Sequence, residues 1–148
     1  MKKKKLIWIL IILLAAIQFI RPEQNTSVQP LPQSFIDTFQ VTDKVKTLLT
    51  TSCFDCHSNN TRYPWYTHIQ PVGWILASHI REGKEKLNFN EVASLSPRRR
   101  NSKFKSITEQ IENGEMPLKS YLQMHKDVKL SERDKNILIH FFQSKMKE

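Results

Sequence analysis

The sequence contains little glycine and proline, with 3 and 7 of these residues among 148. A collagen-like or low-complexity chain is therefore excluded. Apolar residues make up 39% of the chain, and 14 of them lie within residues 6–20. The remainder is poorer in apolar residues than an average soluble domain. The length suits one domain, so we expect a single small core that something other than side chains helps to complete.

Signatures of catalysis and of nucleic-acid binding are also missing. No Ser-His-Asp constellation, paired carboxylates or phosphate-binding loop is apparent, so we expect a protein that is not an enzyme. The net charge of +9 suggests nucleic acid or an acidic surface. However, Lys2–Lys5 carry four of these charges, and no RNA-binding signature, zinc-finger pair or long basic helix accompanies the cluster around Arg98–Arg100. We expect a solvated helix face there and no nucleic-acid partner.

The head of the chain, residues 1–21, resembles a targeting segment. Lys2–Lys5 form a positive region before the apolar run of residues 6–20. A helix of that run rises about 22 Å, short of the roughly 30 Å hydrocarbon core, but snorkelling lysines can extend a short span. No Ala-x-Ala cleavage site follows the run. We therefore predict an uncleaved signal anchor in the inner membrane with the rest of the chain on the periplasmic side. The alternative is a cleaved signal peptide and a soluble periplasmic protein.

Residues 22–33 have no apolar period and contain three prolines among polar residues, which predicts a semi-extended linker. The folded domain is expected over residues 34–148. Within it, strand-like alternation of useful length is missing, whereas helical patterns recur, so we predict an all-α fold of short helices.

Four helices are expected in this domain, each from a start signal and an apolar face. The start signals are Thr42, Pro71, Ser96-Pro97, and the pair Ser131 and Asp134, which resembles a capping box. Gly114 is a natural stop for the third helix. The apolar faces are expected to carry Val45, Leu48 and Leu49; Ile75, Leu76, Ile80 and Leu87, beside His79; Phe104, Ile107 and Ile111; and Ile137, Leu138, Phe141 and Phe142.

The two cysteines form the motif Cys53-Phe54-Asp55-Cys56-His57. A structural zinc site usually needs four ligands, and His68 and His79 are too far apart in sequence for the zinc-finger pattern. A thioredoxin-like dithiol needs a βαβ context, which is not visible. A plain disulfide is a further alternative. The histidine directly after the second cysteine favours covalent haem, in which two thiols bind the vinyl groups and His57 binds the iron.

The sequence around this motif resembles the small bacterial haem-binding domain proteins of the cytochrome c kind. The resemblance covers roughly residue 34 to the C-terminus. It is carried by residues 53–66 (CFDCHSNNTRYPWY), 69–74 (IQPVGW), 79–84 (HIREGK), 87–89 (LNF) and 114–121 (GEMPLKSY). It implies a cytochrome c-like bundle of short helices around one covalent haem c.

The resemblance also implies roles for further residues. Met116, in a Met-Pro pair shortly after Gly114, is similar to the distal loop of class I cytochromes and is the expected sixth iron ligand; Met124 and His125 are alternatives. The carbonyl of Pro71, or of Pro64, is expected to accept the second N–H of His57. Arg62 is expected to pair with a haem propionate. The aromatic residues expected to wall the haem are Tyr63, Trp65, Tyr66 and Trp74. His68, His79 and His140 are expected to be surface or core residues.

We therefore predict an exported monohaem c-type cytochrome that transfers electrons to a redox partner protein. The alternative is a haem-based sensor or a small peroxidase-like enzyme, which would need a displaceable sixth ligand. A structural zinc module is a third possibility.

Overall fold

The structure, a computed structural model, describes residues 2–147, except for the side chain of Asp127. Its α-helices are α1 (Lys2–Ile17), α2 (Gln33–Thr38), α3 (Asp43–Ser52), α4 (Phe54–His57), α5 (Val72–Lys86), α6 (Pro97–Glu112), α7 (Lys119–Met124) and α8 (Glu132–Lys145). Three short 3-10 helices lie between them: η1 (Trp65–His68), η2 (Val92–Ser94) and η3 (Lys126–Val128). Residues 2–147 contain no strand, which confirms the all-α prediction.

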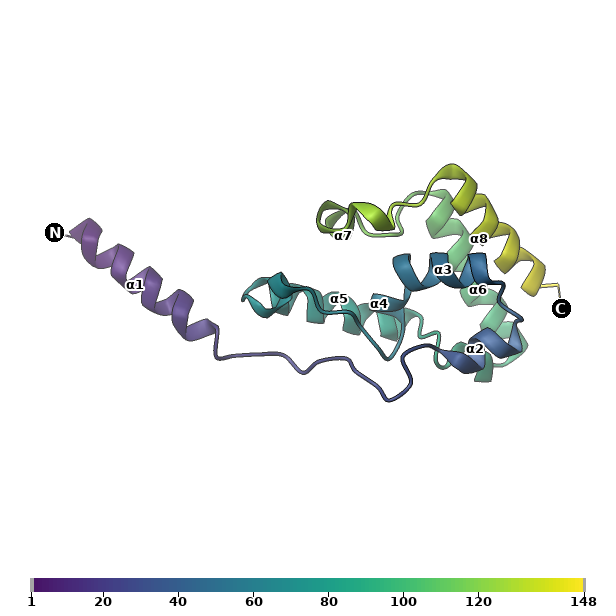
Figure 1. The fold of residues 1–148 in the computed structure, drawn as a ribbon, viewed down its shortest axis with the longest axis horizontal. Coiled ribbons are helices and arrows are strands. Elements are labelled where there is room, and N and C mark those ends of the chain that lie inside the picture. The colour runs from purple at the N-terminus through teal and green to yellow at the C-terminus, as the bar shows by residue number, and fades with distance from the viewer. Residues whose placement is uncertain (1, 148) are drawn as a thin grey trace.

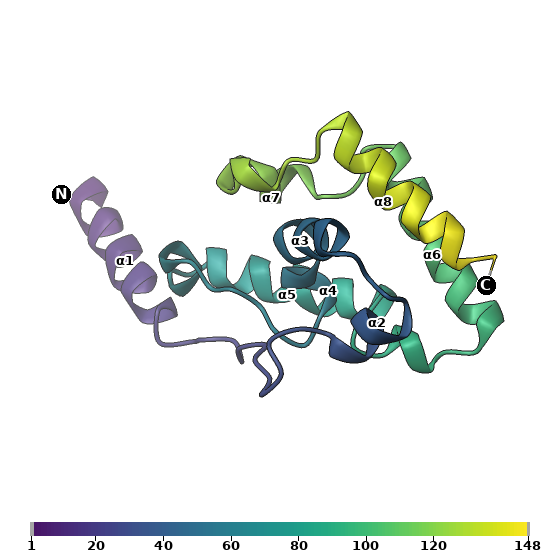
Figure 2. The same cartoon turned by 45° about the vertical axis from the view of Figure 1, so that its right-hand side comes forward.

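Helix α1 stands apart from the other helices in both overall views (Figures 1 and 2) and buries no residue. Within residues 2–147, no helix combines the length and the apolar character that a membrane span requires. The prediction of a spanning anchor is therefore not supported, although a helix does form over most of the predicted segment.

The segment between α1 and α2 is extended, as expected for a linker, but it is not free. Asn25 Nδ2 donates to Ser58 O and to Thr61 Oγ1, each at 2.9 Å, and Lys84 Nζ donates to Asn25 Oδ1. The backbone N–H of Asn25 also donates to Tyr63 Oη at 2.7 Å. One asparagine thus holds the middle of the linker against the loop that follows α4.

The four expected helices, which are α3, α5, α6 and α8, begin at or directly after their predicted start signals, whereas α2, α4 and α7 were not predicted. Pro97 occupies the first turn of α6, and Gly114, with φ of 67°, follows its end. At α8, Ser131 Oγ accepts from the N–H of Asp134 and the Asp134 carboxylate accepts from the N–H of Ser131, which makes a full capping box. Thr42 precedes α3 as expected, but its side chain makes no capping hydrogen bond.

The core consists mainly of phenylalanine rings from α2, the loop after α5, α6 and α8. The Phe35 ring lies 4.9 Å from that of Phe89, and the Phe104 ring lies 5.3 Å from that of Phe142. Helix α6 packs along α8, while α4 packs against α5 (Figure 2). Most residues of the expected faces are buried, but Ile75 is 54% exposed. The apolar face predicted for α5 therefore includes one residue near its N-terminal end, Ile75, that the structure leaves exposed.

Candidate functional site

A cavity of about 400 Å³ with a mostly apolar wall lies where α3, α4, α5 and α6 meet the loop before α7. This volume falls in the range of roughly 300–1,000 Å³ that is usual for sites of small molecules and cofactors. The cavity is lined by Ser52, Cys53, Asp55, Cys56, His57, His79, Glu82, Gly83, Lys86, Leu87, Phe89, Ser102, Lys103, Ser106, Ile107, Gln110, Ile111, Met116, Pro117, Leu118 and Tyr121. Met116 is distant in sequence from the motif that holds Cys53, Cys56 and His57, yet all four residues share one cavity.

The cysteine motif forms the end of α3 and the single turn of α4. Phe54, 3% exposed, anchors this turn in the core, where its ring lies 5.1 Å from that of Phe89. With Phe54 packed inward, Cys53, Cys56 and His57 face the cavity, and both cysteines are free thiols. The local fold therefore presents all three side chains together.

His57 is oriented by the C-terminal part of α5. Its Nδ1 lies 2.9 Å from Gly83 O and 3.1 Å from Leu87 O. Because both partners are carbonyl oxygens, Nδ1 must carry the proton and donate to them. Among the described residues, Nε2 then has no hydrogen-bond partner, and it is the nitrogen that can bind a metal.

The expected acceptor of this N–H, Pro71, has a different role. Its carbonyl accepts the backbone N–H groups of Trp74 and Ile75 in the first turn of α5. Pro64, the other candidate, likewise accepts from Thr67. The prediction for Pro71 was wrong because the carbonyls nearest to His57 lie near the far end of α5, about one helix length away in sequence.

Gly83 permits the close approach of α4 and α5. A Cβ atom at this position would lie 2.6 Å from the carbonyl oxygen of Cys56, which is backbone and cannot swing away. The sequence offered one signal, a glycine inside an otherwise helical pattern, which often marks close packing.

Burial keeps the three motif side chains uncharged. Burial, with a smaller contribution from Cys56, raises the pKa of the Cys53 thiol to about 12. Burial and the neighbouring Asp55 raise the pKa of Cys56 to about 11. The pKa of His57 is lowered, chiefly by burial, which outweighs the opposing effect of the Leu87 and Gly83 carbonyls. A neutral imidazole is the form that binds a metal.

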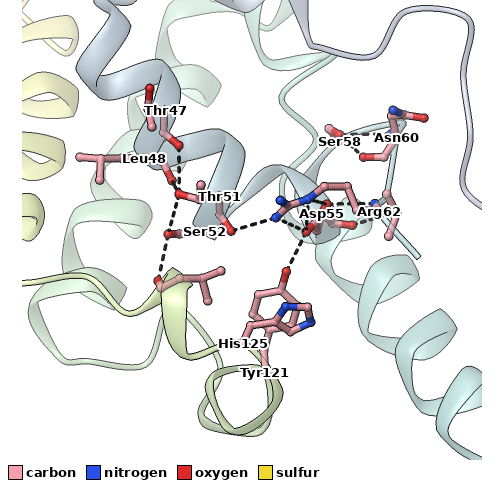
Figure 3. Close-up of polar contacts among 12 residues, drawn as sticks. Thr47, Leu48, Thr51, Ser52, Asp55, Ser58, Asn60, Arg62, Tyr121 and His125 are labelled. Carbon is pink, nitrogen blue, oxygen red and sulfur yellow. Dashed lines mark hydrogen bonds and ion pairs between the residues drawn. The ribbon is translucent and has the colours of Figure 1, made fainter. Parts of the chain in front are cut away.

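Asp55, inside the motif, ties the motif to two other parts of the chain (Figure 3). Arg62 Nη2 donates to Asp55 Oδ2 at 2.9 Å, and the Arg62 backbone N–H donates to Oδ1. Tyr121 Oη donates to Asp55 Oδ2 at 2.7 Å. Arg62 does not line the cavity, so its expected pairing with a propionate is replaced by an ion pair within the protein.

Of the three candidates for a sixth ligand, the structure brings only Met116 to the cavity wall. Met124 is 58% exposed. The His125 ring stacks on that of Tyr121, with centroids 4.3 Å apart, and its Nε2 hydrogen-bonds with the Tyr66 hydroxyl. Both therefore lie outside the cavity lining.

The aromatic residues expected to wall the cavity also lie elsewhere. Trp65 is 75% exposed, Tyr63 holds the linker through Asn25, and the Trp74 indole N–H donates to Ile20 O at 2.8 Å. Tyr66 is engaged with His125. The apolar part of the wall is built instead from Leu87 and Phe89 of the loop after α5 and from Ile107 and Ile111 of α6.

Polar residues also line part of the cavity. His79, which was expected at the surface or in the core, lines it from α5. The others have no role predicted from the sequence: Glu82 and Lys86 of α5, and Ser102, Lys103, Ser106 and Gln110 of α6. Ser102, Ser106 and Gln110 are spaced four residues apart and therefore lie on one face of α6. This spacing is hard to recognise in the sequence because many of the neighbouring residues are also polar. No group of three or more His, Cys, Asp or Glu side chains within residues 2–147 is placed to hold a metal ion. The zinc arrangement of Cys53, Cys56, His68 and His79 is thus not formed.

The family model described as "Haem-binding domain" matches residues 12–144 of this chain. No curated protein and no solved structure matches this chain.

Proposed function

Since the chain belongs to the haem-binding domain family, we propose that it holds one covalently bound haem in the cavity and carries electrons. The observation that carries this proposal is the meeting of Cys53, Cys56, His57 and Met116 on one largely apolar wall. Two thiols, an imidazole and a thioether are a donor set that c-type haem proteins use.

The residues present fit this group on three counts. The thiols of Cys53 and Cys56 are free and unpaired. Nδ1 of His57 is held by Gly83 and Leu87, which leaves Nε2 for an iron. The cavity offers a mostly apolar wall of suitable size for a cofactor.

The thiols of Cys53 and Cys56 would hold the haem through its vinyl groups, by an addition in which S–H becomes S–C and C–H with no leaving group. Nε2 of His57 and the sulfur of Met116 would hold the iron. Bound haem supplies an iron that changes between the ferrous and ferric states. The apolar wall excludes water, and a thioether ligand favours the ferrous state, which suits an electron carrier.

We propose in addition that the domain works outside the cytoplasm. Lys2–Lys5 before the apolar residues of α1 are typical of an exported chain whose lysines stay inside. The protein that exchanges electrons with the haem is then a second redox protein on the outer side of the inner membrane.

Expression of the full chain with a haem-attachment system tests the proposal. Haem should remain with the denatured polypeptide and resist acid-acetone extraction. The double variant Cys53→Ala, Cys56→Ala should lose this attachment, while Ser52→Ala, beside the motif, should keep it. Haem that is fully extractable from the unaltered chain would overturn covalent attachment. A ferrous form that is five-coordinate and binds carbon monoxide freely would favour a sensor or enzyme over a carrier.

A further inference from the structure

One long segment of the folded domain has no charged residue. Charged residues make up 25% of the chain, yet none occurs between Arg62 and Arg81. This segment forms the loop with η1 and the first half of α5. The surface of a soluble domain normally carries many charged side chains. The lack of Lys, Arg, Asp and Glu in a segment of this length therefore indicates that the segment contacts something other than water.

Apolar side chains of this segment are exposed together with the end of the α1 region. We name this surface the apolar edge; it consists of Phe19, Ile20, Trp65, Ile69, Val72 and Ile75. Trp65 is 75% exposed and Phe19 is 87% exposed. Exposed apolar residues gathered in this way mark a surface that contacts something else.

The structure joins the apolar edge to α1 by hydrogen bonds. Gln18 Nε2 donates to Gln70 O at 3.1 Å, and the Gln70 N–H donates back to Gln18 Oε1 at 2.9 Å. The Trp74 indole donates to Ile20 O. In both views the C-terminal end of α1 lies near the loop that carries η1 (Figures 1 and 2). The helix and the edge therefore form one continuous surface.

We propose that the apolar edge is a membrane-docking surface that rests at the headgroup level of the bilayer that α1 enters. Helix α1 exposes its apolar side chains along its whole length, and a lipid phase is the environment in which such a helix is stable. Its lysines lie at the end remote from the edge. An exposed Trp side chain such as Trp65, beside a lipid-contacting helix, is typical of the membrane–water interface.

Docking at this edge sets the orientation of the domain. Residues of α5 from the cavity wall, His79, Glu82, Gly83 and Lys86, belong to its second half, whereas the apolar edge includes its first turn. The cavity therefore lies on the part of the domain away from the bilayer, where a soluble redox partner can approach. The docking itself does not depend on haem, and the insertion of α1 into a bilayer is part of this same proposal.

Photolabelling of the full haem-loaded chain tests this proposal. The chain is incorporated into vesicles of phosphatidylethanolamine and phosphatidylglycerol that contain a phospholipid with a photoreactive diazirine near its glycerol. Label should appear on residues 65–75 at a level several-fold above that on the exposed face of α8. The double variant Trp65→Glu, Ile75→Glu should reduce labelling of Ile69 and Val72 several-fold, while labelling of α1 is retained.

Val28→Glu, which adds a charge at an exposed linker residue, is the matched control and should leave labelling of the edge unchanged. The absorption spectrum and thermal unfolding midpoint of each variant establish that the domain is still folded and loaded. Label on α1 with none on residues 65–75 would overturn the proposal. Absence of bound haem with normal labelling would instead contradict the proposed function and leave docking intact.

Discussion

At Gly83, helix propensity and packing make opposite predictions, and packing should prevail. Propensity alone favours alanine over glycine inside a helix by about 1 kcal/mol. However, the new Cβ would lie 2.6 Å from the Cys56 carbonyl oxygen, and overpacking of this kind costs about 1–3 kcal/mol. Gly83→Ala should therefore destabilise the protein and disturb the carbonyl that orients His57, as measured by urea unfolding and the haem absorption spectrum.

A control for this prediction lies in the same helix. Ala77→Gly measures the propensity effect of α5 without the close contact to Cys56 and should cost about 1 kcal/mol. If Gly83→Ala stabilises the protein by a similar amount with an unaltered spectrum, the close approach of α4 and α5 is not a constraint.

Met116 provides a second prediction at the scale of single residues. It is the candidate ligand that lines the cavity, whereas Met124 is exposed. Met116→Ala should remove the weak absorption band of thioether-bound ferric haem, lower the reduction potential and allow carbon monoxide to bind. Met124→Ala should change none of these properties. The opposite pattern would move the ligand to Met124 while keeping the carrier function.

At the scale of elements, α7 depends on contacts outside itself, because it is a short helix that buries no residue. Its Tyr121 hydroxyl donates to the Asp55 carboxylate. Hydrogen bonds to charged groups contribute about 1.5–3 kcal/mol, and partial exposure of Tyr121 places it at the low end. Tyr121→Phe should lower stability accordingly and speed hydrogen exchange of the amides of α7. If the amides of α7 exchange at the same rate in Tyr121→Phe as in the unaltered chain, other contacts hold the helix.

The stability that the start of α8 contributes is expected to depend on pH. The Ser131 hydrogen bond, followed by that to Lys44, lowers the pKa of Asp134 below its ordinary value of 3.8. A lowered pKa in the folded state means that ionised Asp134 stabilises the fold above that ordinary value, and that this contribution is lost as the pH falls through the lowered pKa. The difference in thermal midpoint between the unaltered chain and Asp134→Asn should thus be present at neutral pH and vanish in acid.

Because the Lys44 side chain is exposed, high salt should also weaken the part of this effect that comes from Lys44. Glu132→Gln provides a comparison in the same first turn, at a side chain outside the capping box. A midpoint difference for Asp134→Asn that is equal at all pH values would contradict the role of the ionised carboxylate.

At the scale of the whole molecule, the charge distribution predicts topology. Lys2–Lys5 precede the apolar residues of α1, and cationic segments are retained in the cytoplasm. A reporter that is active only outside the cytoplasm should be active when fused to the C-terminus. Replacement of Lys2–Lys5 by glutamate should reduce that activity, while the same replacement at Lys145 and Lys147 should not. Reporter activity confined to the cytoplasm would contradict export.

The features that depend on neighbouring residues could be predicted from the sequence alone. The starts of α6 and α8 follow from Pro97 and from the Ser131–Asp134 pair, because capping is completed within one turn. The motif from Cys53 to His57 likewise brings its three donor side chains to one wall through a single helical turn. The all-α fold follows from helical periods that local sequence specifies.

Features that depend on contacts between distant elements were decided only by the tertiary structure. Gly83 and Leu87, rather than Pro71, accept the His57 N–H because α5 passes α4 near its C-terminal end. Arg62 pairs with Asp55 because the loop after α4 folds back on the motif. Trp65, expected to wall the cavity, is 75% exposed in the folded chain. A residue type shows which interactions a side chain can make, but packing between elements selects which of those partners lies within reach.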